Sequence, residues 1–183
     1  MHGPLSFFGF SAHKRLEAMR PRLYRLAYAW CHDAYQADDL AQEAMTKALA
    51  RNAQLRDVAA LEGWLFSILN NCWRDHLRGR REFADVDELD EVILTNEPGP
   101  ERLYASRQTT TRVRNAIAML PMAQRQVITL VDIEECSYAE VAHILQVPVG
   151  TVMSRLSRAR QALKTHLLAE ESASERPALR RVK

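Results

Sequence analysis

The stretch that decides the fold is Ser137-Tyr138-Ala139-Glu140-Val141-Ala142-His143-Ile144-Leu145-Gln146-Val147-Pro148-Val149-Gly150-Thr151-Val152. Ser137 and Glu140 have the spacing of a capping box, in which each side chain accepts a hydrogen bond from the other residue's backbone amide. A helix is therefore predicted to begin at Tyr138. Pro148 suits the first position of a second helix, because proline has no amide hydrogen that would be left unpaired there. The stretch predicts a helix-turn-helix.

The second helix of this motif is predicted to have one apolar side and one polar side. Its apolar side, at about 100° per residue, consists of Val149, Val152, Leu156, Ala159 and Leu163. The side chains opposite and beside it are polar or cationic: Thr151, Ser154, Arg155, Ser157, Arg158, Arg160 and Gln161. Hydroxyl and amide groups suit base edges and arginines suit phosphates, so this helix is a candidate DNA-reading element. The alternative is an amphipathic helix whose polar side faces only solvent.

The rest of the chain also has the periodicity of helices. From Leu16 to Trp30 apolar residues recur every three or four positions, and Pro21 leaves open whether this stripe forms one helix or two. The other helices are expected from about Tyr35 to Arg51, from about Gly63 to Arg81, up to Pro121 and from there to about Asp132, followed by two shorter ones. No useful run alternates apolar and polar residues as a strand would. The predicted fold class is all-α.

Composition excludes several classes of protein. The 183 residues are 47% hydrophobic and include only six glycines and seven prolines, which argues against disordered and turn-rich β chains. No apolar run approaches the roughly 18 to 20 residues that span a bilayer, so we expect a cytoplasmic protein. A net charge of +2 means that any DNA binding must come from local patches. The cysteines, Cys31, Cys72 and Cys136, are too far apart for a zinc knuckle or a disulfide framework, and we expect buried thiols and no metal or cofactor.

The charge distribution suggests two domains. Seven acidic residues and no Lys or Arg occur from residue 84 to residue 101, and the stretch ends in Pro98-Gly99-Pro100. Such a segment cannot readily be buried, and helices stop before proline, so we interpret 84–101 as an acidic flexible linker. It would join an N-terminal helical domain, residues 11–83, to a C-terminal helical domain, residues 102–169. The alternative is a surface loop within a single domain.

One face of the helix predicted from Gly63 to Arg81 is polar and cationic. The residues on this ridge are Ser67, Asn71, Arg74 and Arg78, with Trp64 beside them. The ridge would be about 16 Å long, enough to contact several nucleotides. The candidates for stacking on unpaired bases are Trp64, Phe66 and Trp73, although aromatic residues at helical spacing are more often part of a core. His76, on the apolar side, is expected to be structural.

The preceding helix carries an acidic face formed by Asp38, Asp39, Gln42 and Glu43. Three carboxylates suggest a metal or acid-base site, but no His or Cys is spaced to complete one. A solvated acidic face and a docking surface for a basic partner are the other two hypotheses.

Together these segments resemble an extracytoplasmic-function (ECF) sigma factor of the sigma-70 family. Ala37-Asp38-Asp39-Leu40-Ala41-Gln42-Glu43 is similar to the family's region 2.2, and Trp64-Leu65 with Ile68, Asn71, Asp75 and Arg78 is similar to regions 2.3 and 2.4. Leu120-Pro121, the helix-turn-helix, and Ser154-Arg155-Leu156-Ser157-Arg158-Ala159-Arg160 resemble region 4.

The resemblance implies two domains, sigma-2 and sigma-4, and a function. The acidic face would dock on the coiled coil of the beta-prime subunit of core RNA polymerase. The loop from about Asn52 to Leu61 and the ridge would capture an extruded base of the promoter minus-10 element, while the last helix would read the minus-35 element. The resemblance also implies inhibition by an anti-sigma factor, often the cytoplasmic segment of a membrane protein, which would hold the chain near the inner membrane. It implies no enzymatic activity.

Two departures from the family pattern bear on promoter preference. Met153 stands where the family usually has Lys or Arg, so one contact to minus-35 DNA would be missing. The loop before Trp64 lacks the usual Gly-rich or aromatic sequence. Two rival functions remain at this stage: a free-standing regulator, which would need a ligand or phosphoacceptor domain, and a metal-dependent nuclease using Asp38, Asp39 and Glu43.

Overall fold

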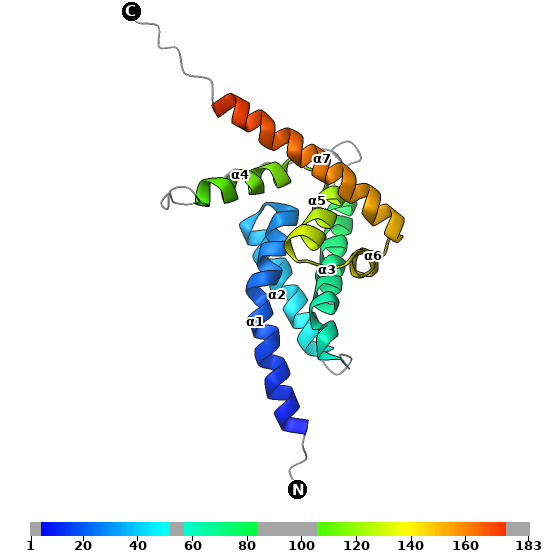
Figure 1. The fold of residues 1–183 in the computed structure, drawn as a ribbon. Helices are drawn as coiled ribbons and strands as arrows, with labels where there is room; N and C mark the ends of the chain where they lie inside the picture. The colour runs from blue at the N-terminus through cyan, green and yellow to red at the C-terminus, as the bar shows by residue number, and fades with distance from the viewer. Residues whose placement is uncertain (1–4, 52–56, 84–105, 175–183) are drawn as a thin grey trace, which may run out of the picture.

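The computed structural model of the chain describes residues 5–51, 57–83 and 106–174 (Figure 1). The first three helices pack side by side and form what we call the N-terminal unit. Its elements are α1 (Leu5–Cys31), α2 (Ala34–Ala50), the 3₁₀ turn η2 (Val58–Ala60) and α3 (Leu61–Phe83). The helix boundaries agree with the sequence-based predictions to within about two residues for α2 and α3.

α1 is one continuous helix with Pro21 inside it, so the possibility of two helices is wrong. Pro21 is solvent-exposed, and its fixed φ is compatible with a helix. Leu16 and Met19 before it and Leu23 and Leu26 after it are buried on the same side. Packing on both sides of the proline therefore holds α1 together despite one missing backbone hydrogen bond.

The core of the N-terminal unit contains large side chains from α1 and α3 and mostly small ones from α2. Phe66 is fully buried and Trp73 is 3% exposed, which shows that both belong to the core and not to a base-stacking surface. α2 contributes Ala37, Ala41 and Ala44, which are also fully buried. Alanines on this face allow α1 and α3 to approach α2 closely.

The remaining helices form the C-terminal unit. Its elements are α4 (Ser106–Ala118), α5 (Met122–Ile128), the π-helical turn η3 (Thr129–Ile133), α6 (Tyr138–Leu145) and α7 (Val149–Ser174). α4 ends before Pro121 as predicted, whereas α7, with 26 residues, is not short. α7 continues through Ser174.

The helix-turn-helix has the predicted local geometry. The Ser137 hydroxyl accepts a hydrogen bond from the Glu140 amide at 3.3 Å, and a Glu140 carboxylate oxygen accepts one from the Ser137 amide at 2.8 Å. Gln146 ends α6 in the left-handed conformation, with φ of 56°. This turn redirects the chain into α7.

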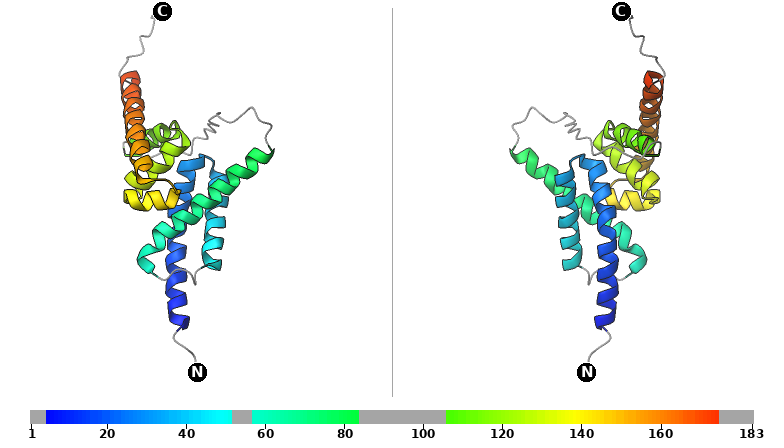
Figure 2. Two further views of the ribbon diagram at one scale, coloured as in Figure 1. Left: turned by 90° about the vertical axis from the view of Figure 1, so that its right-hand side faces the viewer. Right: turned by 90° about the vertical axis from the view of Figure 1, so that its left-hand side faces the viewer.

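The two units pack directly on one another. α3 contacts α6, and α1 contacts α4 and α5, so that the C-terminal unit lies along one side of the α1–α3 bundle (Figure 2). Buried side chains from both units form one continuous hydrophobic cluster. The predicted linker, 84–101, lies outside the described residues, and the domain boundaries stay a prediction.

Cysteine burial differs from the expectation. Cys72 is buried, but Cys31 and Cys136 are only half-buried. Desolvation by burial raises the pKa of each of these two thiols to about 11, so both are protonated at neutral pH. Within the described residues, no helix combines the length and the apolar character needed to cross a membrane.

Candidate functional site

A cationic hollow of about 260 Å³ lies between α2 and α3. Three residues of the predicted ridge, Asn71, Arg74 and Arg78, line it. Two further cations line it that the sequence patterns did not indicate: Lys47, in the last turn of α2, and Arg51, the residue that caps α2. The available signal was their spacing of four residues, which places both on one side of a helix. We call this feature the cationic hollow.

Ion pairs organise the side chains of the cationic hollow. Asp75 lies 3.7 Å from both the Lys47 ammonium and the Arg78 guanidinium, and Glu43 lies 2.7 Å from Lys47. The hydrogen bond to Glu43 is the main reason that the pKa of Lys47 is raised, so Lys47 stays charged. The lining therefore combines several exposed cations with the amide of Asn71. This combination suits a phosphate backbone carrying an unpaired base.

Trp64 and Ser67 lie outside this hollow, although they were predicted to act with the ridge. The Ser67 hydroxyl donates a hydrogen bond to the Gly63 carbonyl at 2.8 Å, within α3. Trp64 is half-buried and packs against the core. The structure thus brings together three of the five residues proposed for the minus-10 element. Of the loop expected from about Asn52 to Leu61, residues 52–56 lie outside the described residues.

The acidic face divides into two parts. Asp38 binds Arg20 of α1 at 2.6 Å and accepts a hydrogen bond from Gln42, also at 2.6 Å. Asp39 and Glu43 instead line a second hollow, of about 290 Å³. Asp38 is not among the residues that line that hollow. Nowhere in the described parts of the chain do three His, Cys, Asp or Glu side chains form a group that could hold a metal ion.

The second hollow has an aromatic rim and a neutral histidine. Tyr35, at 87% exposed, and His76 both line it. The His76 ring stacks on Trp73 with 5.7 Å between ring centroids and contacts the Gln36 side chain. The pKa of His76 is lowered mainly by desolvation and, to a smaller extent, by the positive charge of Arg80. His76 therefore fits the structural role expected for it.

α7 presents most of the predicted DNA-reading residues to solvent. Val152, Leu156 and Ala159 form its buried seam, whereas Val149 is 43% exposed, so its assignment to the seam is wrong. The exposed side chains are Ser154, Ser157, Arg158 and Gln161, and the half-buried ones are Thr151 and Arg155. Met153 is 53% exposed on the same surface.

Arg160 is held by the protein itself. Its guanidinium donates to both carboxylate oxygens of Asp132, at 2.6 and 3.1 Å. The hydrogen bond to Asp132 is the largest cause of the raised pKa of Arg160. Arg160 is therefore less available to phosphates than the sequence suggested, because the Asp132 carboxylate already binds its guanidinium group.

Comparison with known proteins decides the family. Residues 16–83 match the model of sigma-70 region 2, and residues 110–163 match that of sigma-70, region 4. The chain is 34% identical to the ECF RNA polymerase sigma factor EcfG of Rhodopseudomonas palustris over 151 residues, which cover 82% of this chain and 81% of that protein. The chain belongs to the ECF sigma factors. Sigma factors are transcription initiation factors and not enzymes.

Two further relatives extend the comparison. The ECF sigma factor is 33% identical to ECF RNA polymerase sigma factor SigE of Mycolicibacterium smegmatis over 159 residues, which are 86% of this chain but 62% of SigE. The sigma factor RpoE from Bartonella quintana, in complex with the anti-sigma factor NepR, aligns with a TM-score of 0.72 and 30% identity. That alignment covers 85% of this chain and 95% of RpoE, so it includes both helical units.

The family regions contain the features described above. Region 2 includes the cationic hollow and the acidic face, and region 4 includes the helix-turn-helix and the exposed side of α7. Membership of the family also removes the free-standing regulator and the nuclease as explanations of this ECF sigma factor.

Proposed function

We propose that this sigma factor gives core RNA polymerase its promoter specificity through three separate surfaces. The observation that carries the proposal is the cationic hollow, where Asn71 lies among four cations, Lys47, Arg51, Arg74 and Arg78. A base extruded from the non-template strand loses a few kcal/mol of stacking and pairing energy, which contacts in a pocket must offset. The amide of Asn71 can bond to a base edge while the cations neutralise neighbouring phosphates.

The acidic face is the proposed docking surface for the beta-prime subunit of the polymerase. Asp39, Glu43 and the exposed ring of Tyr35 lie around one hollow, which suits a partner helix carrying basic residues. Asp38 and Gln42 contribute from the adjoining part, where Asp38 is bound to Arg20. Interfaces concentrate their binding energy in aromatic and charged anchors of this kind.

α7 is the proposed reader of the minus-35 element. Its exposed side chains, Ser154, Ser157, Arg158 and Gln161, can reach base edges in a major groove, and Thr151 and Arg155 lie beside them. Met153 adds an exposed apolar group to this surface. An apolar group suits a thymine methyl and not a phosphate.

An anti-sigma factor is the proposed regulator. RpoE of Bartonella quintana forms a complex with the anti-sigma factor NepR, and its fold matches both helical units of this chain. We place the sigma factor in the cytoplasm, held near the inner membrane when its inhibitor is a segment of a membrane protein.

Binding to core polymerase and run-off transcription test the proposal. Asp39→Lys and Glu43→Lys reverse charges at the docking surface, so each should abolish binding to purified core polymerase while the helical circular dichroism is retained. Glu62→Lys is the matched control, since it makes the same charge change near the start of α3, away from the acidic face, and should retain core binding. Normal core affinity in both acidic-face variants would remove the docking assignment. A wild-type protein that fails to direct initiation from any member of a promoter library would contradict the function.

A further inference from the structure

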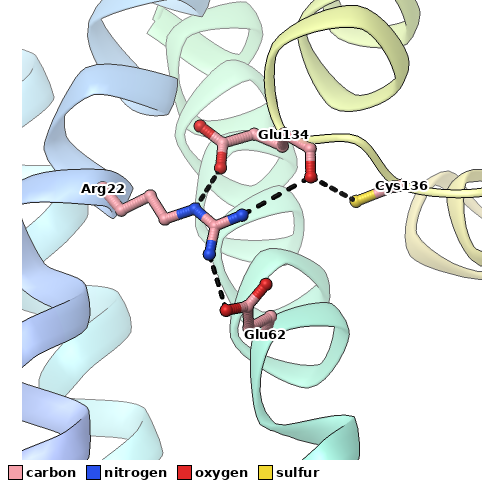
Figure 3. Close-up of polar contacts among 4 residues, drawn as sticks. All are labelled: Arg22, Glu62, Glu134 and Cys136. Carbon is pink, nitrogen blue, oxygen red and sulfur yellow. Dashed lines mark hydrogen bonds and ion pairs between the residues drawn. The ribbon is translucent and has the colours of Figure 1, made fainter.

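Charged side chains at the junction of the two units already have partners within the chain. In Figure 3 the Arg22 guanidinium of α1 lies between Glu62 of α3 and Glu134 of the C-terminal unit. One guanidinium nitrogen of Arg125 donates to the backbone carbonyl of Trp30 at 2.6 Å. These groups need no external ligand, whereas part of the apolar surface of α7 has no place in the core.

Two large apolar side chains of α7 lie at the surface of the molecule. Val149 is 43% exposed and Met153 is 53% exposed, and neither belongs to the hydrophobic cluster formed by the described residues. Residues four apart lie on the same side of a helix, with about 5 to 6 Å between their Cβ atoms. Val149 and Met153 therefore form one apolar strip, which we call the apolar edge. Single exposed apolar residues are ordinary on protein surfaces, but neighbouring ones suggest a contact.

The apolar edge borders the surface of α7 that is proposed to read DNA. It occupies the first two turns of the second helix of the helix-turn-helix, the part that contacts base edges in proteins with this motif. Ser154 and Ser157, which follow Met153 by one and four residues, are exposed. The apolar edge and these hydroxyl groups therefore face the same groove when α7 binds a duplex.

Gly150 leaves room beside the apolar edge. A side chain at this position would meet no other part of the protein within 4 Å of its Cβ atom. Gly150 lies three residues before Met153 and four before Ser154, so it is next to both on the helix surface. Because glycine has no side chain, a base edge can approach the helix backbone there and reach the side of Met153.

The first turns of α7 also carry no charge. The residues from Pro148 to Ser154 include no Lys, Arg, Asp or Glu, and the first cation is Arg155. A phosphate would lose hydration against the apolar edge without gaining a hydrogen bond, which is unfavourable. On the base edges of a major groove, the apolar group is the C5-methyl of thymine. Methionine is unbranched and flexible, so Met153 can adjust to such a methyl group.

We propose that Val149 and Met153 select thymine in the minus-35 element by packing against its C5-methyl group. The proposal rests on the function proposed above, in which α7 reads that element. Contacts to phosphates position a protein on DNA without reading sequence, whereas a contact to the methyl group identifies the position of a thymine. The apolar edge therefore adds sequence preference at one or two base pairs next to those read by Ser154 and Arg158.

Deoxyuridine tests this contact, because it differs from thymidine only by the missing methyl group. Holoenzyme made from the wild-type chain and core polymerase first selects duplexes from a library randomised in the minus-35 element. We expect thymine to be enriched at one or two adjacent base pairs. Replacing each selected thymine by deoxyuridine should weaken holoenzyme binding by about fourfold, the effect of one buried methyl group. Fluorescence anisotropy of labelled duplexes measures both affinities.

Substitution of Met153 tests the protein side of the contact. Met153→Gln keeps an unbranched side chain of similar length but ends it in a polar amide, so the variant should bind thymine and deoxyuridine duplexes equally. Leu168→Gln is the matched control: it makes a similar change at a residue that is 52% exposed and lies about four turns farther along α7. This control should keep the fourfold difference. Val149→Thr, which replaces a methyl group by a hydroxyl, should reduce the difference at the neighbouring thymine.

Two results would overturn the proposal. If the selection enriched no thymine, or if the wild-type holoenzyme bound thymine and deoxyuridine duplexes equally at every selected position, no methyl group would be read. If Met153→Gln and Val149→Thr both kept the full difference, another part of the protein would read the methyl group. Run-off transcription from the selected promoters is measured in parallel. Initiation without a methyl effect contradicts only the apolar edge, whereas absence of initiation contradicts the proposed function.

Discussion

Arg125 connects three parts of the molecule through one buried guanidinium. Besides the carbonyl of Trp30, it donates to the carbonyls of Ala118 and Leu120, at 2.8 and 3.0 Å. It is 6% exposed, and desolvation lowers its pKa. An arginine nevertheless stays protonated at neutral pH. Its fork satisfies carbonyls at the ends of α1 and α4 that would otherwise be buried without donors.

Replacing Arg125 should therefore destabilise the whole protein. We expect Arg125→Met to lower the free energy of unfolding by about 3 kcal/mol, because three buried carbonyls lose their donor. Arg125→Lys should recover little, since an ammonium group lacks the planar fork. Urea denaturation followed by circular dichroism measures both. Arg20→Met is the control, because it removes an exposed arginine from a surface ion pair and should lower the free energy of unfolding by under about 1 kcal/mol. If both methionine variants lowered the free energy of unfolding by similar amounts, the structural role of Arg125 would be refuted.

His32 gives the protein a defined pH dependence. Desolvation by burial is the main cause, and the charge of Arg125 the second, that lowers the pKa of His32 to about 4. The His32 ring packs edge-on against Tyr28, with 5.8 Å between the ring centroids. A histidine with a lowered pKa binds its proton more tightly in the unfolded chain, so stability is present above about pH 6.5 and is lost as the pH falls toward 4.

The variant His32→Asn isolates this contribution, since asparagine tolerates the left-handed backbone at residue 32, where φ is 54°. The difference in unfolding free energy between wild type and variant should fall by about 1 to 2 kcal/mol between pH 7 and pH 4, a figure reduced for partial solvent exposure. Urea titrations at intervals across this range provide the measurement. A difference that stays constant over the range would show that His32 does not titrate as described.

At the scale of the element, the two arginines of α7 at positions 158 and 160 are expected to behave differently. Arg158 is exposed on the side proposed to read DNA, whereas Arg160 is bound to Asp132. Arg158→Ala should lose about 1 to 3 kcal/mol of discrimination between matched and scrambled minus-35 sequences. Arg160→Ala removes the same charge, and it should weaken binding to the matched and the scrambled sequence slightly and by equal amounts. Competition binding of the polymerase holoenzyme to the matched and scrambled duplexes measures the discrimination. If Arg158→Ala lost the same affinity for both duplexes, Arg158 would not read bases.

Local signals made most helices predictable. The capping box of Ser137 and Glu140 and the apolar repeat of α1 act over one or two turns, so a single sequence contains them. The continuity of α1 through Pro21 could not be predicted, since it depends on packing supplied by other helices. The ridge was only partly predictable: its spacing identified Asn71, Arg74 and Arg78, but the contribution of α2 to the cationic hollow depends on how α2 and α3 pack.

At the scale of the whole molecule, the contact between the two units was not predictable from the sequence. An acidic segment between two helical halves suggested independent domains, and Asn70 and Arg125 resemble ordinary polar residues of amphipathic helices. Their partners, Ile144 and Trp30, lie 74 and 95 residues away along the chain. No periodic pattern encodes contacts over such separations, because they depend on the complementarity of two finished surfaces.

The shared core predicts that both units of the free protein unfold together. Buried side chains of α1 and α3 and those of α5 to α7 form one cluster, so loss of either unit exposes apolar surface on the other. We expect one transition in differential scanning calorimetry, with equal calorimetric and van't Hoff enthalpies. Two separate transitions in the wild-type protein would contradict a shared core.

The position of Trp30 also gives the molecule its own optical reporter. The indole is fully buried where α1 meets the C-terminal unit, and its N–H is bonded to Thr129. The other two tryptophans, Trp64 and Trp73, pack within the N-terminal unit and supply a steady background. Exposure of the Trp30 ring to water should shift its fluorescence emission to longer wavelength, so the emission reports without an attached dye whether the two units stay packed together.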